Sequence, residues 1–353
     1  MKNFGITIVL CLALFAFIGC EECEDCPPPT APSDTNHTDI DPPFIRWVSG
    51  PAQVVVGGSA QFDCEILSDA EIIRKSWNLD LFAGDYFYPA IAEEGYFTPE
   101  GARPYPFAET DTGDAPSFVY ENRGMFTVGL EIEDEDGYIE HSGTMIEVIP
   151  ETPDDGSIHV LYAAMTDTIL GANFDLQRFS LIAEPAYPAC VYSDGFGQFA
   201  AYSFIESDSM AGYRIIRSSA EVGKLLGIEG SGWFLAYIEL DFDVEGALHI
   251  WGDNPADMVE YSVYFTVKHV DGLPRTNYLY SKRLTPSDGE AFYLKNSYFI
   301  EDTVRVMGNE LYEFWFGMET FQYHAPGQSG SAVCFDGVPA PTRLNRAMFT
   351  LDK

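Results

Sequence analysis

The feature that most constrains the fold is an alternation of apolar and polar residues over positions 118–132. Successive side chains of a β-strand point to opposite faces, so this period of two predicts strands with one buried face and one wet face. Gly124 lies within the run, where we expect a tight turn. The acidic residues from Glu133 to Asp136, followed by Gly137, then predict the turn that ends it.

Further short alternating runs, separated by Gly, Pro and Asp, follow along the chain, and aromatic residues make up 14% of it. These features are typical of an all-β protein. The expected strands cover residues 52–56, 59–66, 142–149, 158–162, 233–242, 247–251, 259–270, 278–284, 303–307, 311–318 and 347–351. One short helix is predicted at 219–227, because Ser219 can cap its start, Glu221 falls in its first turn and Gly227 can end it.

The length of 353 residues suggests two domains. The first is expected at residues 44–149, and it contains a long insertion at 79–117. Residues 150–156, which combine acidic side chains with Pro and Gly, form the predicted linker. Residues 157–353 are then the second domain, for which the strand pattern predicts a larger β-sandwich or jelly-roll-like fold.

The first domain resembles the PKD family, an immunoglobulin-type β-sandwich. The residues that carry the resemblance are Trp77 and the motif Tyr120-x-x-x-Gly124-x-Phe126-Thr127-Val128-x-Leu130-x-Ile132-x-Asp134-x-x-Gly137. In such a sandwich the Tyr120 hydroxyl can pin the turn, and Gly124 takes a conformation that a Cβ would oppose. The resemblance implies extracellular spacing or contacts with protein or carbohydrate, and by itself never catalysis. The chain departs from the family at the insertion, where a compact Gly-Asp-Gly turn is usual.

The first 19 residues predict an export signal. Lys2 precedes an uncharged apolar run at residues 5–19, which is shorter than the roughly 20 residues that a membrane-spanning helix needs. Residues 17–20, Phe-Ile-Gly-Cys, resemble the bacterial lipoprotein signal, with Phe17 in place of the usual Leu. The resemblance implies cleavage before Cys20 and lipidation of its thiol. Ordinary secretion with cleavage nearby is the alternative.

The acidic, proline-rich residues 20–43 predict an extended tether behind that lipid. A lipoprotein anchor implies a membrane as partner, with the folded part held at the bacterial outer membrane or cell surface. The composition also excludes one class of partner. The chain carries 19 basic and 55 acidic residues, a formal net charge of −36, whereas binding to nucleic acid requires clustered Lys and Arg.

The acidic turn after residue 132 is the one candidate metal site. Asp134 and Asp136 offer carboxylate oxygens of the kind that Ca²⁺ prefers, but their spacing does not match an EF-hand loop. A solvated acidic turn is the simpler interpretation, and no other cofactor is expected. The six histidines are scattered and show no metal-ligand spacing.

The insertion at 79–117 is rich in aromatic residues. Its candidate ligand-binding residues are Tyr86, Tyr88, Tyr96 and Tyr105. Rings held on a proline-rich loop can stack against a sugar or a peptide. The same rings can instead form the small core that a long loop needs, which is the simpler interpretation.

Two cysteines, Cys190 and Cys334, lie in the second domain. In an exported chain we expect them to form a disulfide, which would close a long loop and lower the entropy of the unfolded chain.

No catalytic residue is assigned. Glu239, Asp241, Asp243 and Glu245 alternate along one expected strand. Two of them facing a groove about 5 to 10 Å apart would match the carboxylates of a glycosidase. Alternation alone also places them on the wet face of any half-buried strand. The sequence thus favours an exported, membrane-anchored binding or structural module for protein or carbohydrate. A polysaccharide-active hydrolase with an accessory PKD-like domain is the alternative.

Overall fold

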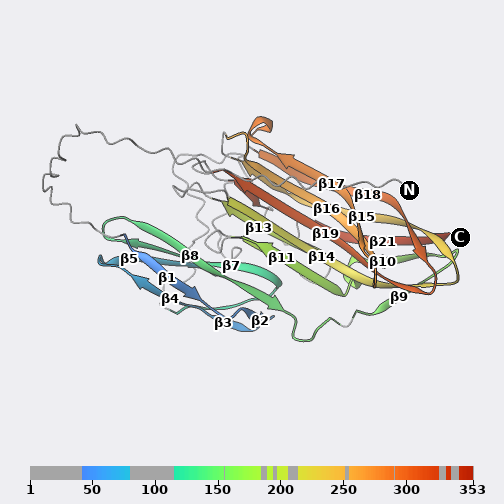
Figure 1. Ribbon diagram of the computed structural model, residues 1–353, viewed down its shortest axis with the longest axis horizontal. Coiled ribbons are helices and arrows are strands. Elements are labelled where there is room, and N and C mark those ends of the chain that lie inside the picture. The colour runs from blue at the N-terminus through green and yellow to red at the C-terminus, as the bar shows by residue number, and fades with distance from the viewer. Residues whose placement is uncertain are drawn as a thin grey trace, which may run out of the picture. The chain divides into compact units, whose positions relative to one another are not determined.

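The computed structural model describes residues 42–79, 115–154, 156–183, 189–193, 197–205, 214–250, 254–289, 291–325, 331–334 and 342–352. Within these ranges the chain forms 21 β-strands and two short 3-10 helices, and it contains no α-helix (Figure 1). The prediction of an all-β protein is confirmed. Among the described residues, no helix reaches the length and hydropathy that a membrane crossing requires.

Eight strands cover the region of the first predicted domain. They are β1 (Phe44–Ser49), β2 (Gln53–Val55), β3 (Ser59–Gln61), β4 (Asp63–Leu67), β5 (Ile72–Asn78), β6 (Ser117–Val119), β7 (Arg123–Asp134) and β8 (Ile139–Ile149). β5, β7 and β8 pair side by side, β2 joins β8 in parallel, and β1–β4 and β3–β6 form two-stranded sheets. Their apolar side chains enclose a core around Trp77 and Phe126. The buried Tyr120 hydroxyl donates a 2.8 Å hydrogen bond to the Leu79 carbonyl, which ties the approach to β7 to the end of β5.

Gly124 departs from its expected role. It lies inside β7 rather than at a turn, and its backbone does not have a positive φ. A Cβ at this position would instead lie 2.1 Å from the carbonyl oxygen of Val191 and 2.7 Å from the Cα of Tyr192, on a neighbouring strand. Glycine is therefore needed for the close approach of two strands and not for an unusual backbone conformation.

Thirteen strands follow. They are β9 (Ile158–Tyr162), β10 (Thr166–Leu170), β11 (Leu176–Ile182), β12 (Ala189–Ser193), β13 (Gln198–Ile205), β14 (Arg214–Glu229), β15 (Trp233–Ile250), β16 (Met258–His269), β17 (Pro274–Leu284), β18 (Ala291–Met307), β19 (Glu310–His324), β20 (Ser331–Cys334) and β21 (Thr342–Asp352). The 3-10 helices are η1 (Gly171–Asn173) and η2 (Pro286–Asp288).

These strands build a large β-sandwich. One layer is the six-stranded sheet β11-β14-β19-β16-β17, with β9 parallel to β14. The other contains β10, β21, β15 and β18. Aromatic rings from both layers meet in the core, where Phe316 of β19 lies 5.3 Å from Phe242 of β15 and Phe314 lies 5.2 Å from Phe349 of β21, centroid to centroid.

One strand of the second half belongs to the sheet of the first. β12 pairs antiparallel with β7, with Val191 opposite Met125, and continues the sheet through β13 and β20 to β15. The Thr127 hydroxyl accepts a hydrogen bond from the Ala189 amide at 2.8 Å. The fully buried Cys190 packs in the core of the first half. The two halves therefore have separate cores and share one sheet.

The helix predicted at 219–227 is wrong, because these residues lie inside β14. β14 pairs with β19 from Arg214 to Ile228, and that long register outweighs the local helix signals. Val222 and Leu226 are buried in the core of the large sandwich. Glu221 is bound across the sheet by Arg178 rather than lying in a helical first turn.

The disulfide between Cys190 and Cys334 stays a prediction, since the side chain of Cys334 lies outside the described residues. The backbone register places β13 between β12 and β20, with Cys190 opposite Tyr202 and Val333 opposite Ser203. Two strand spacings amount to about 9.6 Å, while the Cα atoms of a disulfide lie within about 7 Å. A bond would require the backbone here to depart from this register.

Candidate functional site: the outer face of β15 and β18

The outer face of β15 and β18 is set by alternation. In β15 the side chains of Phe234, Ala236, Ile238 and Leu240 are buried in the core. The residues between them point away from it. β18 runs antiparallel alongside β15 over its whole length, so its outward residues lie directly opposite those of β15. We call this surface the ring face.

Three aromatic rings stand out on the ring face. Trp233 is 52% exposed, Tyr237 is 41% exposed, and Phe299 of β18 is 53% exposed. Trp233 and Tyr237 lie four residues apart on one strand, which corresponds to about 14 Å. Phe299 is opposite Asp241, a further four residues along. The guanidinium of Arg305 lies 4.5 Å from the Trp233 ring centre and stacks on it.

Hydroxyl groups flank the middle ring. Tyr237 is opposite Thr303 on β18 and opposite Thr350 on β21. The hydroxyl of Thr350 is hydrogen-bonded to that of Thr166 on β10 at 2.9 Å. A ring with donors and acceptors on both sides suits a ligand that is apolar on one face and polar at its edge.

Two carboxylates also lie on the ring face. Glu239 and Glu301 are direct cross-strand partners, and no described ion pair neutralises either of them. Like charges directly opposite each other destabilise a sheet, so this pair has a cost that packing does not explain.

The four carboxylates singled out in the sequence all point outward on β15. Three of them have partners: Asp241 lies 3.4 Å from Arg346, Asp243 accepts a hydrogen bond from Ser297, and Glu245 binds Lys295 at 2.8 Å. None of the four is among the residues that line the pocket at β9, β10 and β14. The arrangement is that of a wet strand face.

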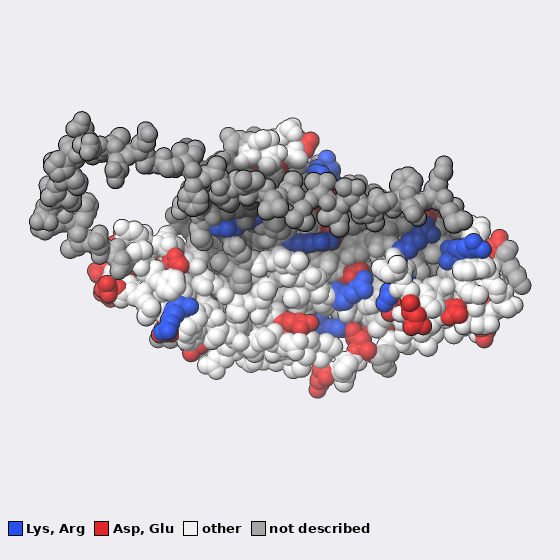
Figure 2. All heavy atoms as spheres, viewed as in Figure 1, with Lys and Arg blue, Asp and Glu red and all other residues white. Residues whose placement is uncertain are grey.

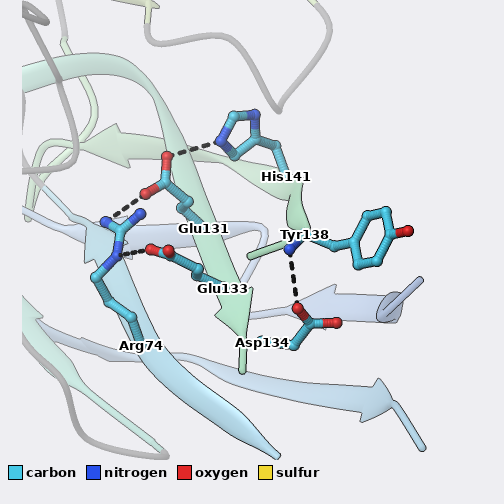
Figure 3. A network of polar contacts seen from close by, with 6 residues as sticks. All are labelled: Arg74, Glu131, Glu133, Asp134, Tyr138 and His141. Carbon is cyan, nitrogen blue, oxygen red and sulfur yellow. Dashed lines mark hydrogen bonds and ion pairs between the residues drawn. The ribbon is translucent and has the colours of Figure 1, made fainter. Parts of the chain in front are cut away.

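Backbone hydrogen bonds to Asp134 hold the acidic turn of the first half. Oδ1 of the buried Asp134 accepts the backbone N–H group of Asp136 at 3.1 Å. The same oxygen accepts the N–H group of Tyr138 at 2.8 Å (Figure 3). Asp136 is exposed. The described residues contain no group of three or more metal-ligating side chains. A calcium site at Asp134 and Asp136 stays a prediction.

Beside this turn lies a buried ion network. Figure 3 shows Glu131 of β7 between Arg74 of β5 and His141 of β8, at 2.5 Å and 2.7 Å, with Glu133 also bound to Arg74 at 2.8 Å. Burial opposes the ionisation of Glu131. The hydrogen bond and charge of His141, together with Arg74, nevertheless hold the pKa of Glu131 below its usual range. The network joins three strands through one carboxylate.

The outer face of the six-stranded sheet differs in kind, and we call it the charged face. Its ion pairs are Arg178–Glu221, Arg217–Glu319, Arg283–Glu260 and Lys268–Glu313. Figure 2 shows basic and acidic side chains next to one another over these strands. Trp315 on this face is only 8% exposed, and the guanidinium of Arg178 lies 4.2 Å from its ring centre.

Several predicted site residues cannot be placed. Cys20 and the insertion tyrosines Tyr86, Tyr88, Tyr96 and Tyr105 lie outside the described residues. The sequence reasoning missed the ring face, although Trp233 and Tyr237 share one parity in a strand that it predicted. Phe299 on the neighbouring strand carried no local signal.

No protein-family model matches the chain, and no curated protein matches it. Solved structures give weak likenesses. A carbohydrate-binding module of the β-sandwich superfamily is 13% identical over 87% of this chain and 99% of its own, with a TM-score of 0.25. SGBP-B of the Bacteroides ovatus mixed-linkage glucan utilization locus, in complex with a heptasaccharide, is 8% identical over 78% of this chain and 100% of its own, with a TM-score of 0.20. Eiger TNF from S. frugiperda is 12% identical over 36% of this chain and 64% of its own, with a TM-score of 0.15. At such TM-scores none of these likenesses carries an argument.

Proposed function

We propose that this protein is a non-enzymatic carbohydrate-binding module that recognises a glycan chain on the ring face. The observation that carries the proposal is the set of three exposed rings, Trp233, Tyr237 and Phe299, in register on two adjacent strands. Several exposed aromatic rings on one face of a sheet are candidates for a recognition surface. The rings lie on long paired strands, so they are held in place before a ligand arrives.

The chemistry of the face suits a sugar chain. β15 is paired on both sides, by β18 and by β21, so the groups that it presents on this face are side chains. They include rings that can stack on the C–H face of a sugar, and Thr303, Thr350 and Glu301 next to them can hydrogen-bond its hydroxyls.

The rest of the proposal concerns location. The export signal and the Phe-Ile-Gly-Cys sequence support lipidation at Cys20, with residues 20–43 as a tether at the outer membrane or cell surface. Residues 44–149 would act as the PKD-like, immunoglobulin-type spacer of such a protein. Metabolic labelling with a fatty-acid probe tests the anchor. The wild type should be labelled, and equal labelling of Cys20→Ala would refute it.

Binding is tested with the purified folded part on a glycan array, followed by calorimetry with each soluble glycan that is retained. Each ring is expected to contribute on the order of 1 kcal/mol, so Trp233→Ala with Tyr237→Ala should weaken the Kd at least about tenfold. Tyr278→Ala is the matched control, because Tyr278 is an exposed ring on β17 of the other sheet. No retained glycan, or equal loss in both variants, would contradict the proposal.

A polysaccharide-active hydrolase is the second candidate, and the opposed pair Glu239 and Glu301 favours it. Retaining glycosidases use two carboxyl groups about 5 to 5.5 Å apart. Incubation of the protein with each retained glycan, followed by a reducing-end assay, decides between the two. Release of reducing ends that Glu301→Gln abolishes, with binding intact, would replace the binding module by the hydrolase.

A further inference from the structure

A pocket of about 420 Å³ opens where the two layers of the large sandwich come together at β9, β10 and β14. Its lining residues are Ser157, His159, Thr168, Ile169, Asn173, Asp175 and Lys224. None of these residues belongs to β15 or β18, so the pocket is separate from the ring face. Its size falls within the range of small-molecule sites, about 300 to 1,000 Å³.

The floor of the pocket is a charged cluster. The ammonium of Lys224, whose side chain is 8% exposed, lies 2.7 Å from Asp175 Oδ2 and 2.6 Å from the Ser157 hydroxyl. Ser157 donates to the same Asp175 oxygen from its hydroxyl at 2.5 Å and from its amide at 3.0 Å. The second oxygen, Asp175 Oδ1, is buried and has no hydrogen-bond partner within the described part of the chain.

Burial opposes the ionisation of Asp175, but the hydrogen bonds from Lys224 and Ser157 hold the pKa of its carboxyl below the usual range. The carboxylate is thus held ionised beside the Lys224 nitrogen. At the rim, His159 Nε2 is engaged by Asp167 at 2.9 Å. Among the lining residues, Thr168 and Asn173 are exposed and offer a hydroxyl and an amide. A neutral ligand with many hydroxyl groups therefore meets both donors and acceptors.

We propose that this pocket binds a single neutral monosaccharide unit, at a site separate from the ring face. The exposed hydroxyl of Thr168 and the exposed amide of Asn173 both donate to and accept from the sugar hydroxyls, and Lys224 donates to them. The pocket is bounded by strands and by η1, so these groups are fixed before binding. The proposal does not depend on the ring face.

A nucleophilic serine is the competing interpretation of the same cluster. Lysine activates a serine hydroxyl only in its neutral form. Here the Lys224 nitrogen donates to the Ser157 hydroxyl oxygen, and the Ser157 proton is donated to the Asp175 carboxylate rather than to the lysine. The cluster therefore suits binding rather than acyl transfer.

The test uses saturation-transfer NMR of the folded protein with D-glucose, D-galactose, D-mannose and N-acetyl-D-glucosamine, each up to about 10 mM, which is ten times a Kd of 1 mM. At least one sugar should receive saturation. Asn173→Trp should abolish the signal by filling the pocket, and it should fold because Asn173 is exposed and its side chain makes no described hydrogen bond. Lys224→Met should weaken binding at least about tenfold, with folding checked by circular dichroism.

Tyr237→Ala is the control, and it should leave the monosaccharide signal unchanged while affecting glycan binding at the ring face. Absence of saturation with all four sugars would overturn the pocket site and leave the ring face untouched. A signal that survives in Asn173→Trp would also overturn it, because the sugar would then be bound elsewhere.

Discussion

The two outer faces of the large sandwich are built from strands of similar length but differ in how their side chains are used. On the charged face, Glu221 is nearly buried and is bound by Arg178, and Tyr264 and Trp315 are also covered. On the ring face, Trp233, Tyr237 and Phe299 remain open, and Glu239 and Glu301 take part in no ion pair among the described residues.

The difference lies in the glycines. On the charged face Gly223 leaves room for the ring of Trp315, and Gly317 leaves room for the stem of Glu221. Large side chains can therefore lie down on the sheet and satisfy one another. On the ring face Arg305 stacks on Trp233, and Trp233, Tyr237 and Phe299 remain about half exposed. The covered aromatic residues of the charged face contribute to stability, whereas the exposed ones of the ring face are available to a ligand.

The largest expected effect is that of Glu221→Ala on the charged face. It removes the partner of Arg178 and leaves a space above Gly317. Because Arg178 is itself about half exposed, we expect a loss of about 2 to 3 kcal/mol, at or below the low end for a broken buried pair. Urea denaturation measures it. If Glu221→Ala lowered the free energy of unfolding less than Arg305→Ala on the ring face, the charged face would not be the one whose side chains stabilise the fold.

Gly317→Ala tests the glycine explanation directly. The new Cβ would lie 2.5 Å from Glu221 Cγ and 3.0 Å from the carbonyl oxygen of Ala220. Overpacking of this kind costs about 2 kcal/mol. The midpoint of thermal unfolding reports it, and Gly232→Ala is unsuitable as a control because of its positive φ. Thr303→Ala on the ring face serves instead, and it should change stability little.

Tyr264→Phe is expected to have a smaller, pH-dependent effect. Burial, followed by the charges of Glu221 and Glu319, raises the pKa of Tyr264 well above its usual range. The pKa of Tyr264 is thus higher in the folded chain than in the unfolded chain, where it is about 10. The stability that the neutral hydroxyl contributes is fully present below pH 10 and is lost as the pH rises beyond it. The substitution removes the hydrogen bond between the Tyr264 hydroxyl and the Glu221 carboxylate. Loss of a hydrogen bond to a charged group costs about 1.5 kcal/mol at pH 7. The difference in free energy of unfolding between wild type and variant should narrow from pH 9 to pH 11. A difference that stays constant over this range would contradict the prediction.

The smallest stability effect is expected on the ring face. Trp233→Ala, Tyr237→Ala and Phe299→Ala should each change the free energy of unfolding by about 0.5 kcal/mol or less, because exposed side chains contribute little. Denaturation curves of the three variants measure it. A cost near 3 kcal/mol for any one of them would show that its ring is a structural element and that the two faces are alike.

The strand pattern of the sequence was sufficient for the class of fold. Residues 158–162 were predicted as a strand and form β9, and 233–242 lie within β15. Local pattern could not identify partners, however. β14 was taken for a helix over 219–227 because its helix signals are local and its pairing with β19 joins residues about 100 positions apart.

The candidate site shows the same limit. Alternation places Trp233 and Tyr237 on one face of a strand, but Phe299 joins them only through the antiparallel register of β15 and β18. The roles of the carboxylates Asp241, Asp243 and Glu245 depended in the same way on residues of other strands, namely Arg346, Ser297 and Lys295. Lys224 is polar in a core-facing position, and no sequence pattern indicates that Ser157 and Asp175 surround it.

The pairing of β12 with β7 bears on whether the first half can be produced as an isolated domain. A fragment that ended at Ile149 would lose the strand that covers residues 123–126 of β7, and with it Cys190, Tyr192 and Ala200 from its core. The fragment would display an open, apolar strand edge, which is a template for self-association. The gene segment for residues 44–149 thus encodes most of a sandwich, and the chain completes it only after synthesis has passed Ser193.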